Sequence, residues 1–173
     1  ELFEANGWEL VPQFANAGNV SFVIPITNVP DDPWSNVKVR EAVFSHGIDL
    51  VGAAAAIVGE AGYHTDAIGY KDATYYDEGL EFTSLDYELA KKMLAEAGYP
   101  DGFKTRIVAD ATTQTQATVI QAELKKLGIE AEVEMPDMNE MQKFWTGENT
   151  AGGLMVGAMY FADPILDRLD KFY

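Results

Sequence analysis

Two segments in the second half of the chain repeat one pattern, in which an amphipathic stretch ends at a glycine and a strand-like stretch follows. The first predicts a helix that Asp86 caps and Gly98 ends, with four apolar residues on one face: Ala90, Met93, Leu94 and Ala97. Pro100, Asp101 and Gly102 then predict a turn that leads into a strand over residues 105–109.

The second segment follows the same order. Its helix ends at Gly128 and has an apolar stripe made of Ala117, Ile120, Leu124 and Leu127. The strand after it alternates between apolar residues and glutamates: Ile129, Ala131, Val133 and Met135 against Glu130, Glu132 and Glu134. Such a strand buries one face, and the three glutamates are best explained as the charges of an exposed edge.

The remaining pattern predicts further strands and helices. Residues 20–27 predict a strand that Pro25 restricts to an edge or a bulge, and residues 154–161 predict a strand buried on both faces. Residues 37–58 predict two helices, or one helix kinked near Asp49, and Asp137 caps another that runs to about Trp145. The irregular residues 59–84 are a candidate cleft wall or lid. Alternating helices and strands favour a mixed α/β architecture.

The residues at the two helix ends resemble a known family. LAEAGYPDGF (residues 94–103) followed by IQAELKKLGI (residues 120–129) is similar to the family 5 extracellular solute-binding proteins, the peptide- and nickel-binding subunits of bacterial ABC importers. Two more blocks fit in the same order, one between Asn28 and Asp49 and one at Ala162-Asp163-Pro164. The resemblance implies a periplasmic-binding-protein-like (type II) α/β lobe, with a mixed sheet flanked by helices. Family members are much longer, so residues 1–173 are expected to form a single partial domain that covers much of the second (C-terminal) lobe of a two-lobe protein.

The resemblance also implies a function. Such a protein captures an oligopeptide or similar small solute outside the cell, in the periplasm or the extracellular space, and delivers it to an ABC permease. A lipid anchor near the true N-terminus and a monomeric state are expected with it. A solute sensor built on the same lobe, and an oligosaccharide binder, are the alternatives.

Composition excludes several other classes. The chain carries 28 acidic residues against 12 basic ones, for a formal net charge of −16, and this charge argues against binding to nucleic acid. It has no cysteine, which excludes disulfides and thiolate chemistry. No apolar run reaches the roughly 18 residues that a membrane span requires.

Catalytic chemistry is not indicated. The two histidines are His46 and His64, and the pair His64 and Asp66 is better explained by an ordinary polar role than by a metal or a general base. The sequence has no G-x-S-x-G motif and no phosphate-binding loop with its lysine. We therefore predict no enzyme, no cofactor and no metal site.

The ligand-binding residues are predicted partly from the resemblance. In peptide-binding relatives an aspartate three positions before the Asp-Pro pair holds the ligand's amino group, and an arginine before the second helix grips a carboxylate. Here Tyr160 stands at the first place, and residues 110–116 contain no arginine. This implies recognition by aromatic stacking and neutral hydrogen bonds, for which the predicted residues are Tyr160, Phe161, Thr112, Thr113 and Gln114, with Trp34 or Trp145 as stacking partner. Core packing of the two aromatic residues and helix capping by the threonines are the alternatives. Arg40 is expected to tie its helix to the lobe through carboxylates.

Overall fold

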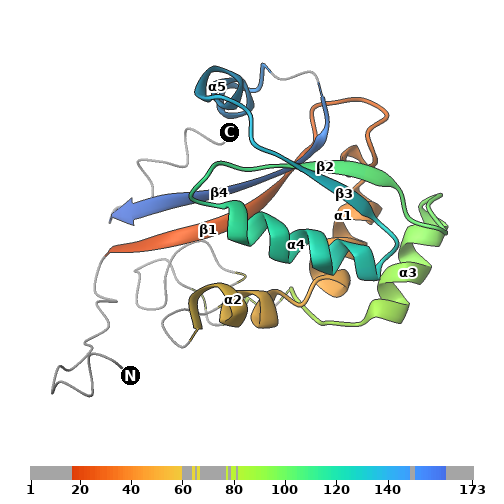
Figure 1. The fold of residues 1–173 in the computed structure, drawn as a ribbon. Helices are drawn as coiled ribbons and strands as arrows, with labels where there is room; N and C mark the ends of the chain where they lie inside the picture. The colour runs from red at the N-terminus through yellow and green to blue at the C-terminus, as the bar shows by residue number, and fades with distance from the viewer. Residues whose placement is uncertain are drawn as a thin grey trace, which may run out of the picture.

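The fold is a four-stranded mixed sheet with helices on both sides (Figure 1). The computed structural model describes residues 17–59, 64, 66, 77, 79–80, 82–148 and 151–162. The strands are β1 (Ala17–Ile26), β2 (Lys104–Val108), β3 (Glu130–Glu134) and β4 (Gly153–Ala162), in the order β1-β4-β2-β3. β4 pairs with β1 in antiparallel and with β2 in parallel, and β2 pairs with β3 in parallel.

Helices fill the segments between the strands. The first group is the short 3-10 helix η2 (Pro33–Ser35), α1 (Val37–Glu41), the π-helical stretch η3 (Ala42–Gly47) and α2 (Leu50–Val58). The second group is α3 (Tyr87–Glu96), α4 (Gln114–Lys126) and α5 (Met138–Thr146). Figure 1 shows α2 and α4 on one side of the sheet and α5 on the other. The predicted alternation of helices and strands is therefore confirmed.

The main core lies between the sheet and α4. Ala117, Ile120 and Leu124 of α4 are buried against Ile107 of β2 and Leu154 of β4. Ala90 and Leu94 of α3, with Val39 and Val43 from the first helical group, continue this core. The two apolar stripes predicted from helical spacing are thus the faces that pack inward.

Aspartate side chains begin the helices where the sequence predicted a cap. Asp86 accepts a hydrogen bond from the Leu89 N–H at 3.0 Å, and Asp49 accepts one from the Gly52 N–H at 2.8 Å. Asp137 does the same for α5. Val37–Gly47 and Leu50–Val58 meet at an angle of 61°, so the predicted break near Asp49 is confirmed.

The helices were compared with the length and composition that a membrane span requires. Among the described residues no single helix is long and apolar enough to cross a bilayer, whereas this bent pair meets the length and composition criteria.

Two glycines bring the ends of α3 and α4 together. Gly102 has φ +78°, and a Cβ at this position would lie 2.2 Å from the carbonyl oxygen of Gly128. Gly128 has φ +80° and approaches the carbonyl oxygen of Asp101. No side chain fits between the two turns, which explains why each turn contains a glycine.

The edges of the sheet match the sequence prediction. β1 is an edge strand and contains Pro25, whose missing N–H is tolerated there. β3 is the other edge strand, and Glu130 and Glu132 on it are exposed. β4 lies inside the sheet, and its residues 153–157 are buried.

The predicted partners of Arg40 were wrong. Its guanidinium donates hydrogen bonds to the backbone carbonyls of Trp34, at 2.7 Å, and Ser35, at 3.0 Å. These two carbonyls stand at the end of η2, so Arg40 fixes the short helix to α1, and no carboxylate among the described residues pairs with it.

Candidate functional site

The parallel strands end at one edge of the sheet, and this edge is the candidate site. β2 connects through α4 to β3 on one side, whereas β4 lies on the other side of β2. In open α/β sheets, ligands bind outside the carboxyl ends of the strands where the connections diverge in this way. The segment that leaves β2 at this edge is the turn of residues 109–113, which leads into α4.

Asp110 holds this turn with its carboxylate. The Thr112 and Thr113 N–H groups donate to its Oδ1 at 2.8 and 3.0 Å, and the Thr112 hydroxyl donates to the same atom at 2.6 Å. The hydrogen bond from the Thr112 hydroxyl is the strongest influence and lowers the pKa of Asp110; burial acts against it, and the bonds from Thr113 add to it. The Oδ1 atom of this carboxylate is therefore occupied by its own turn.

Thr112, Thr113 and Gln114, the predicted ligand residues of this turn and of the first position of α4, differ in exposure. Thr113 is fully buried, and its hydroxyl lies 3.1 Å from the Asp110 carboxylate and 3.3 Å from the Val156 carbonyl oxygen of β4. Thr113 precedes α4 as its N-cap residue but makes no side-chain capping bond. Thr112 and Gln114 are exposed. Thr113 thus joins the turn to β4, and its two neighbours face outward.

β4 extends past the end of β2 toward the predicted aromatic residues. Val108, the last residue of β2, is level with Met155, and Tyr160 pairs with Asn19 of β1. Position 160 therefore lies about 13 Å further along β4 than Val156, which Thr113 touches. Positions 160 and 161 belong to opposite faces of the strand. The side chains of Tyr160 and Phe161 lie outside the described part.

Gln116 and Ser21 meet beside this turn, and the sequence analysis missed both. The Gln116 Nε2 atom lies 3.5 Å from the Ser21 hydroxyl oxygen, which brings the first turn of α4 against β1. Ser21 is level with Ala158 of β4, two positions before Tyr160. The Gln116 Oε1 atom is buried and has no hydrogen-bond partner among the residues that the structure describes. The only sequence signal is that Gln116 directly precedes Ala117 on the apolar stripe.

The two tryptophans that we predicted as stacking partners, Trp34 and Trp145, lie in different parts of the fold. Trp34 is fully buried: its indole Nε1 donates to the Thr105 hydroxyl at 2.8 Å, and its ring packs against Phe44 and Phe103. Trp34 is therefore not placed to be the stacking partner that we predicted, because the core surrounds the indole and Thr105 satisfies its N–H. Trp145 belongs to α5, on the side of the sheet opposite α4 (Figure 1), and its side chain lies outside the described part.

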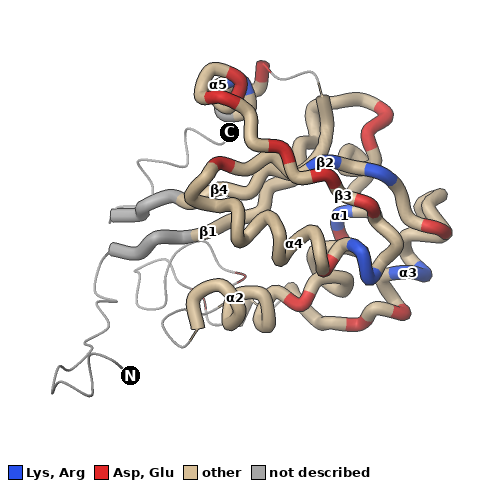
Figure 2. Tube along the Cα trace, viewed as in Figure 1, with Lys and Arg blue, Asp and Glu red and all other residues tan. Residues whose placement is uncertain are grey.

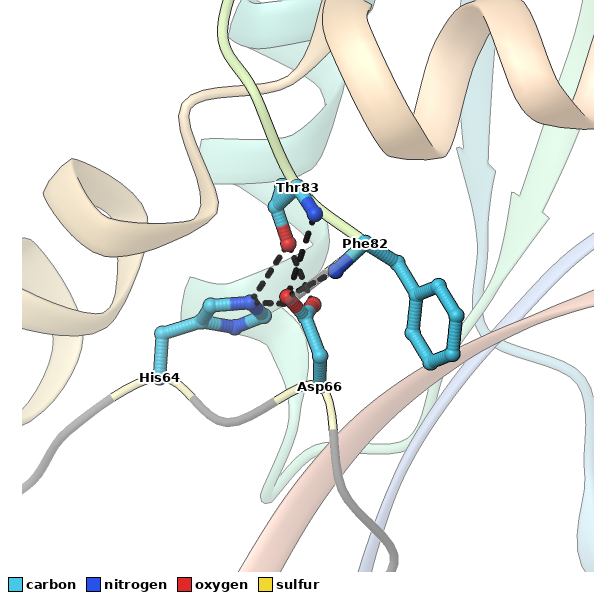
Figure 3. A network of polar contacts seen from close by, with 4 residues as sticks. All are labelled: His64, Asp66, Phe82 and Thr83. Atoms are coloured by element: carbon cyan, nitrogen blue, oxygen red, sulfur yellow. Dashed lines mark hydrogen bonds and ion pairs between the residues drawn. The ribbon is translucent and has the colours of Figure 1, made fainter. Parts of the chain in front are cut away.

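The segment predicted as a cleft wall or lid, residues 59–84, lies mostly outside the described residues, but part of it forms a compact polar network (Figure 3). Asp66 accepts hydrogen bonds from the N–H groups of Phe82, at 2.9 Å, and Thr83, at 3.1 Å, and from the Thr83 hydroxyl. His64 Nε2 lies 2.9 Å from the same carboxylate. Burial alone would raise the pKa of Asp66, but the four hydrogen bonds outweigh it and lower this pKa.

This network has the polar role that the sequence predicted for His64. Across the residues that the structure describes, no group of three or more histidine or carboxylate side chains could hold a metal ion. His46 Nδ1 lies 2.9 Å from the Ser84 carbonyl oxygen and so connects η3 to the end of the same segment.

Charge is distributed unevenly over the fold. β1, α2, β4 and the first half of α4 contain no Asp, Glu, Lys or Arg, although the whole chain carries a net charge of −16. Figure 2 shows α2 and the start of α4 without charged residues, whereas acidic residues follow β3 and α5. The elements on the β1 and β4 side of the candidate edge are thus uncharged in a strongly acidic molecule, whereas Asp110 and, at the end of β3, Glu134 carry charge at the same edge.

The family is shown by comparison with known proteins. The model of the bacterial extracellular solute-binding proteins, family 5 (Middle), matches residues 4–166. The chain therefore belongs to this family, as the resemblance of the helix ends implied.

Individual relatives agree with this assignment. The chain is 33% identical over 117 residues to the glutathione-binding protein GsiB of Salmonella choleraesuis, and the match covers 65% of this chain and 22% of GsiB. It thus spans about a fifth of the length of this curated relative.

Solved structures show the same fold. The dipeptide-binding protein of Pseudoalteromonas sp. SM9913, in complex with Met-Leu, superimposes with a TM-score of 0.68 at 22% identity, over 93% of this chain and 33% of that one. The ABC transporter-associated periplasmic binding protein DppA of Helicobacter pylori, in complex with the peptide STSA, gives 0.65 at 22% identity, over 84% and 29%. The predicted fold class, a periplasmic-binding-protein-like α/β unit, is confirmed.

Proposed function

We propose that this chain is part of a substrate-binding protein of an ABC importer, which captures an oligopeptide or similar small solute outside the cell and delivers it to a permease. The observation that carries the proposal is the family match over residues 4–166. Relatives that bind glutathione, Met-Leu and the peptide STSA support a peptide-like solute.

The ligand-contacting part of this chain is proposed to be the carboxyl edge of the parallel strands. Thr112 and Gln114 are exposed there, and β4 carries Tyr160 and Phe161 beyond them. Affinity in such proteins arises when two lobes close on the ligand and exclude water, and this chain supplies residues of one lobe.

Small molecules that co-purify with the full-length protein test this proposal. We expect mass spectrometry to find a bound peptide or similar solute, and calorimetry with the stripped protein to show that this molecule, Met-Leu or glutathione binds again. A full-length protein that retains no small molecule and binds none of these probes would contradict the function.

Variants then test the edge. Gln114→Ala and Tyr160→Ala are expected to weaken binding of the identified solute without unfolding the protein. Gln142→Ala is the matched control, because Gln142 is also an exposed glutamine but belongs to α5. Equal affinities for Gln114→Ala, Tyr160→Ala and the control would remove this edge from the binding site.

A further inference from the structure

We propose that Gln116 and Ser21 form a neutral hydrogen-bonding pair that contacts the bound solute and selects a group that both donates and accepts, such as a peptide amide or a hydroxyl. This inference rests on the proposed function. It adds a contact on α4 and β1 to the edge described above.

The first observation is the incomplete pairing of the Gln116 amide. Its Oε1 atom is buried without a hydrogen-bond partner, and its Nε2 atom has a single long contact of 3.5 Å to the Ser21 hydroxyl. Exchange of the amide nitrogen and oxygen leaves the same result, because the hydroxyl can donate to one or accept from the other. In both orientations one half of the amide has no partner in this structure.

The second observation is the position of the pair. Gln116 lies about one helical turn after Thr112, and Ser21 is level with Ala158, two positions before Tyr160. Ser21 is exposed and Gln116 is partly exposed. The pair therefore lies between the two groups of residues that we assign to the ligand.

The third observation is the absence of charge from the elements that meet there. β1, β4 and the first half of α4 contain no charged residue, and the nearby Asp110 carboxylate directs its Oδ1 atom to Thr112 and Thr113 of its own turn. A charged group of a ligand that was desolvated here would have no counter-charge from these elements. A neutral group with a donor and an acceptor would complete the Gln116 amide once this partly exposed side chain turns its buried Oε1 atom toward the ligand.

The unpaired amide predicts an unusual effect on stability. A buried polar atom without a partner lowers the stability of the folded protein, so its replacement by an apolar group of similar size is neutral or stabilising. We expect the ligand-free full-length Gln116→Met variant to have a melting temperature equal to or above that of the wild type. A lower melting temperature would overturn the inference, because it would assign the amide a role in the fold alone.

Ligand binding supplies the second readout. Stripped full-length proteins are incubated with an equimolar mixture of synthetic di- to pentapeptides and malto-oligosaccharides, and the molecules retained by the wild type are identified by mass spectrometry. For the tightest binder we expect Gln116→Met to lower the affinity about five- to tenfold. Gln116→Glu is expected to lower it further, because a charge is then buried beside an uncharged solute group. Ser21→Ala should show a smaller loss than Gln116→Met.

Gln142→Met on α5 is the matched control and should leave the affinity unchanged. Affinities of Gln116→Met and Gln116→Glu equal to that of the control would overturn the inference while leaving the proposed function intact. A wild type that retains no member of the mixture would contradict the proposed function instead, and the melting temperature of Gln116→Met would then decide whether the amide belongs to the fold.

Discussion

At the scale of single residues, Asp110 makes a testable contribution to stability through its turn. Its pKa lies below the ordinary value of 3.8, so the stabilisation from the ionised carboxylate is complete above that value and is lost as the pH falls through the lower pKa of the folded protein. Asp110→Asn should lower the free energy of unfolding at pH 7 by about 1–2 kcal/mol. It should also flatten the decrease in stability below pH 4.

Urea unfolding at pH 7, 4 and 3 measures both effects. Asp101→Asn is the matched control, because Asp101 is an exposed aspartate in another turn. If Asp110→Asn and this control have the same stability at every pH, the carboxylate does not hold the turn.

Residue types predicted the caps but not the exposure of the candidate ligand residues. Asp86 and Asp49 could be assigned from sequence because an N-cap depends on its neighbours in the chain. The burial of Thr113 depends on Val156, and the burial of Trp34 depends on Thr105. Gln116 and Ser21 lie 95 positions apart in the chain. Their contact depends on the order of the strands and on the packing of α4 against the sheet, and neither is local in sequence.

At the scale of elements, the contact between the two glycine turns fixes α3 and β2 against the end of α4. Gly102→Ala would introduce a Cβ 2.2 Å from the Gly128 carbonyl oxygen, in addition to the left-handed backbone conformation. We expect this change to lower the free energy of unfolding by about 2–5 kcal/mol, as the sum of backbone strain and overpacking. Chemical denaturation of the purified chain would measure it.

Gly98→Ala separates the two causes. Gly98 has φ +100°, and a Cβ there would meet nothing within 4 Å, so only the backbone strain of about 1–2 kcal/mol remains. Equal losses for both variants would contradict the role of close contact at Gly102.

The elements themselves were largely predictable because their signals are local. Both helices with apolar stripes, the break near Asp49 and the edge position of β1 follow from spacing, caps and Pro25. The order of the strands was not predictable in this way, because β4 is inserted between β1 and β2 through pairs far apart in the chain. The candidate edge is a product of that order, so the sequence could propose residues of its turn and of β4 but not that they lie at one edge of the sheet.

At the scale of the whole molecule, two electrostatic effects on stability have opposite signs: surface ion pairs stabilise the fold, and the repulsion that comes with the net charge of −16 destabilises it. Lys104–Glu130 and Lys143–Glu140 are exposed pairs, and such pairs contribute little to stability. Repulsion among the excess acidic residues acts over the whole fold and favours the unfolded chain. Salt weakens both effects, but it should weaken the larger one, the repulsion, by more.

We therefore expect the melting temperature of the 173-residue chain at pH 7 to rise when sodium chloride is increased from about 0.02 M to 0.5 M, over which the screening length falls from about 20 Å to about 4 Å. Calorimetry at the two concentrations measures the change. Lys143→Gln removes one exposed pair and makes the chain more negative, so its melting temperature should rise by more over the same range. A fall with salt in the wild type would mean that the ion pairs outweigh the repulsion, and that the acidic surface costs this fold little stability.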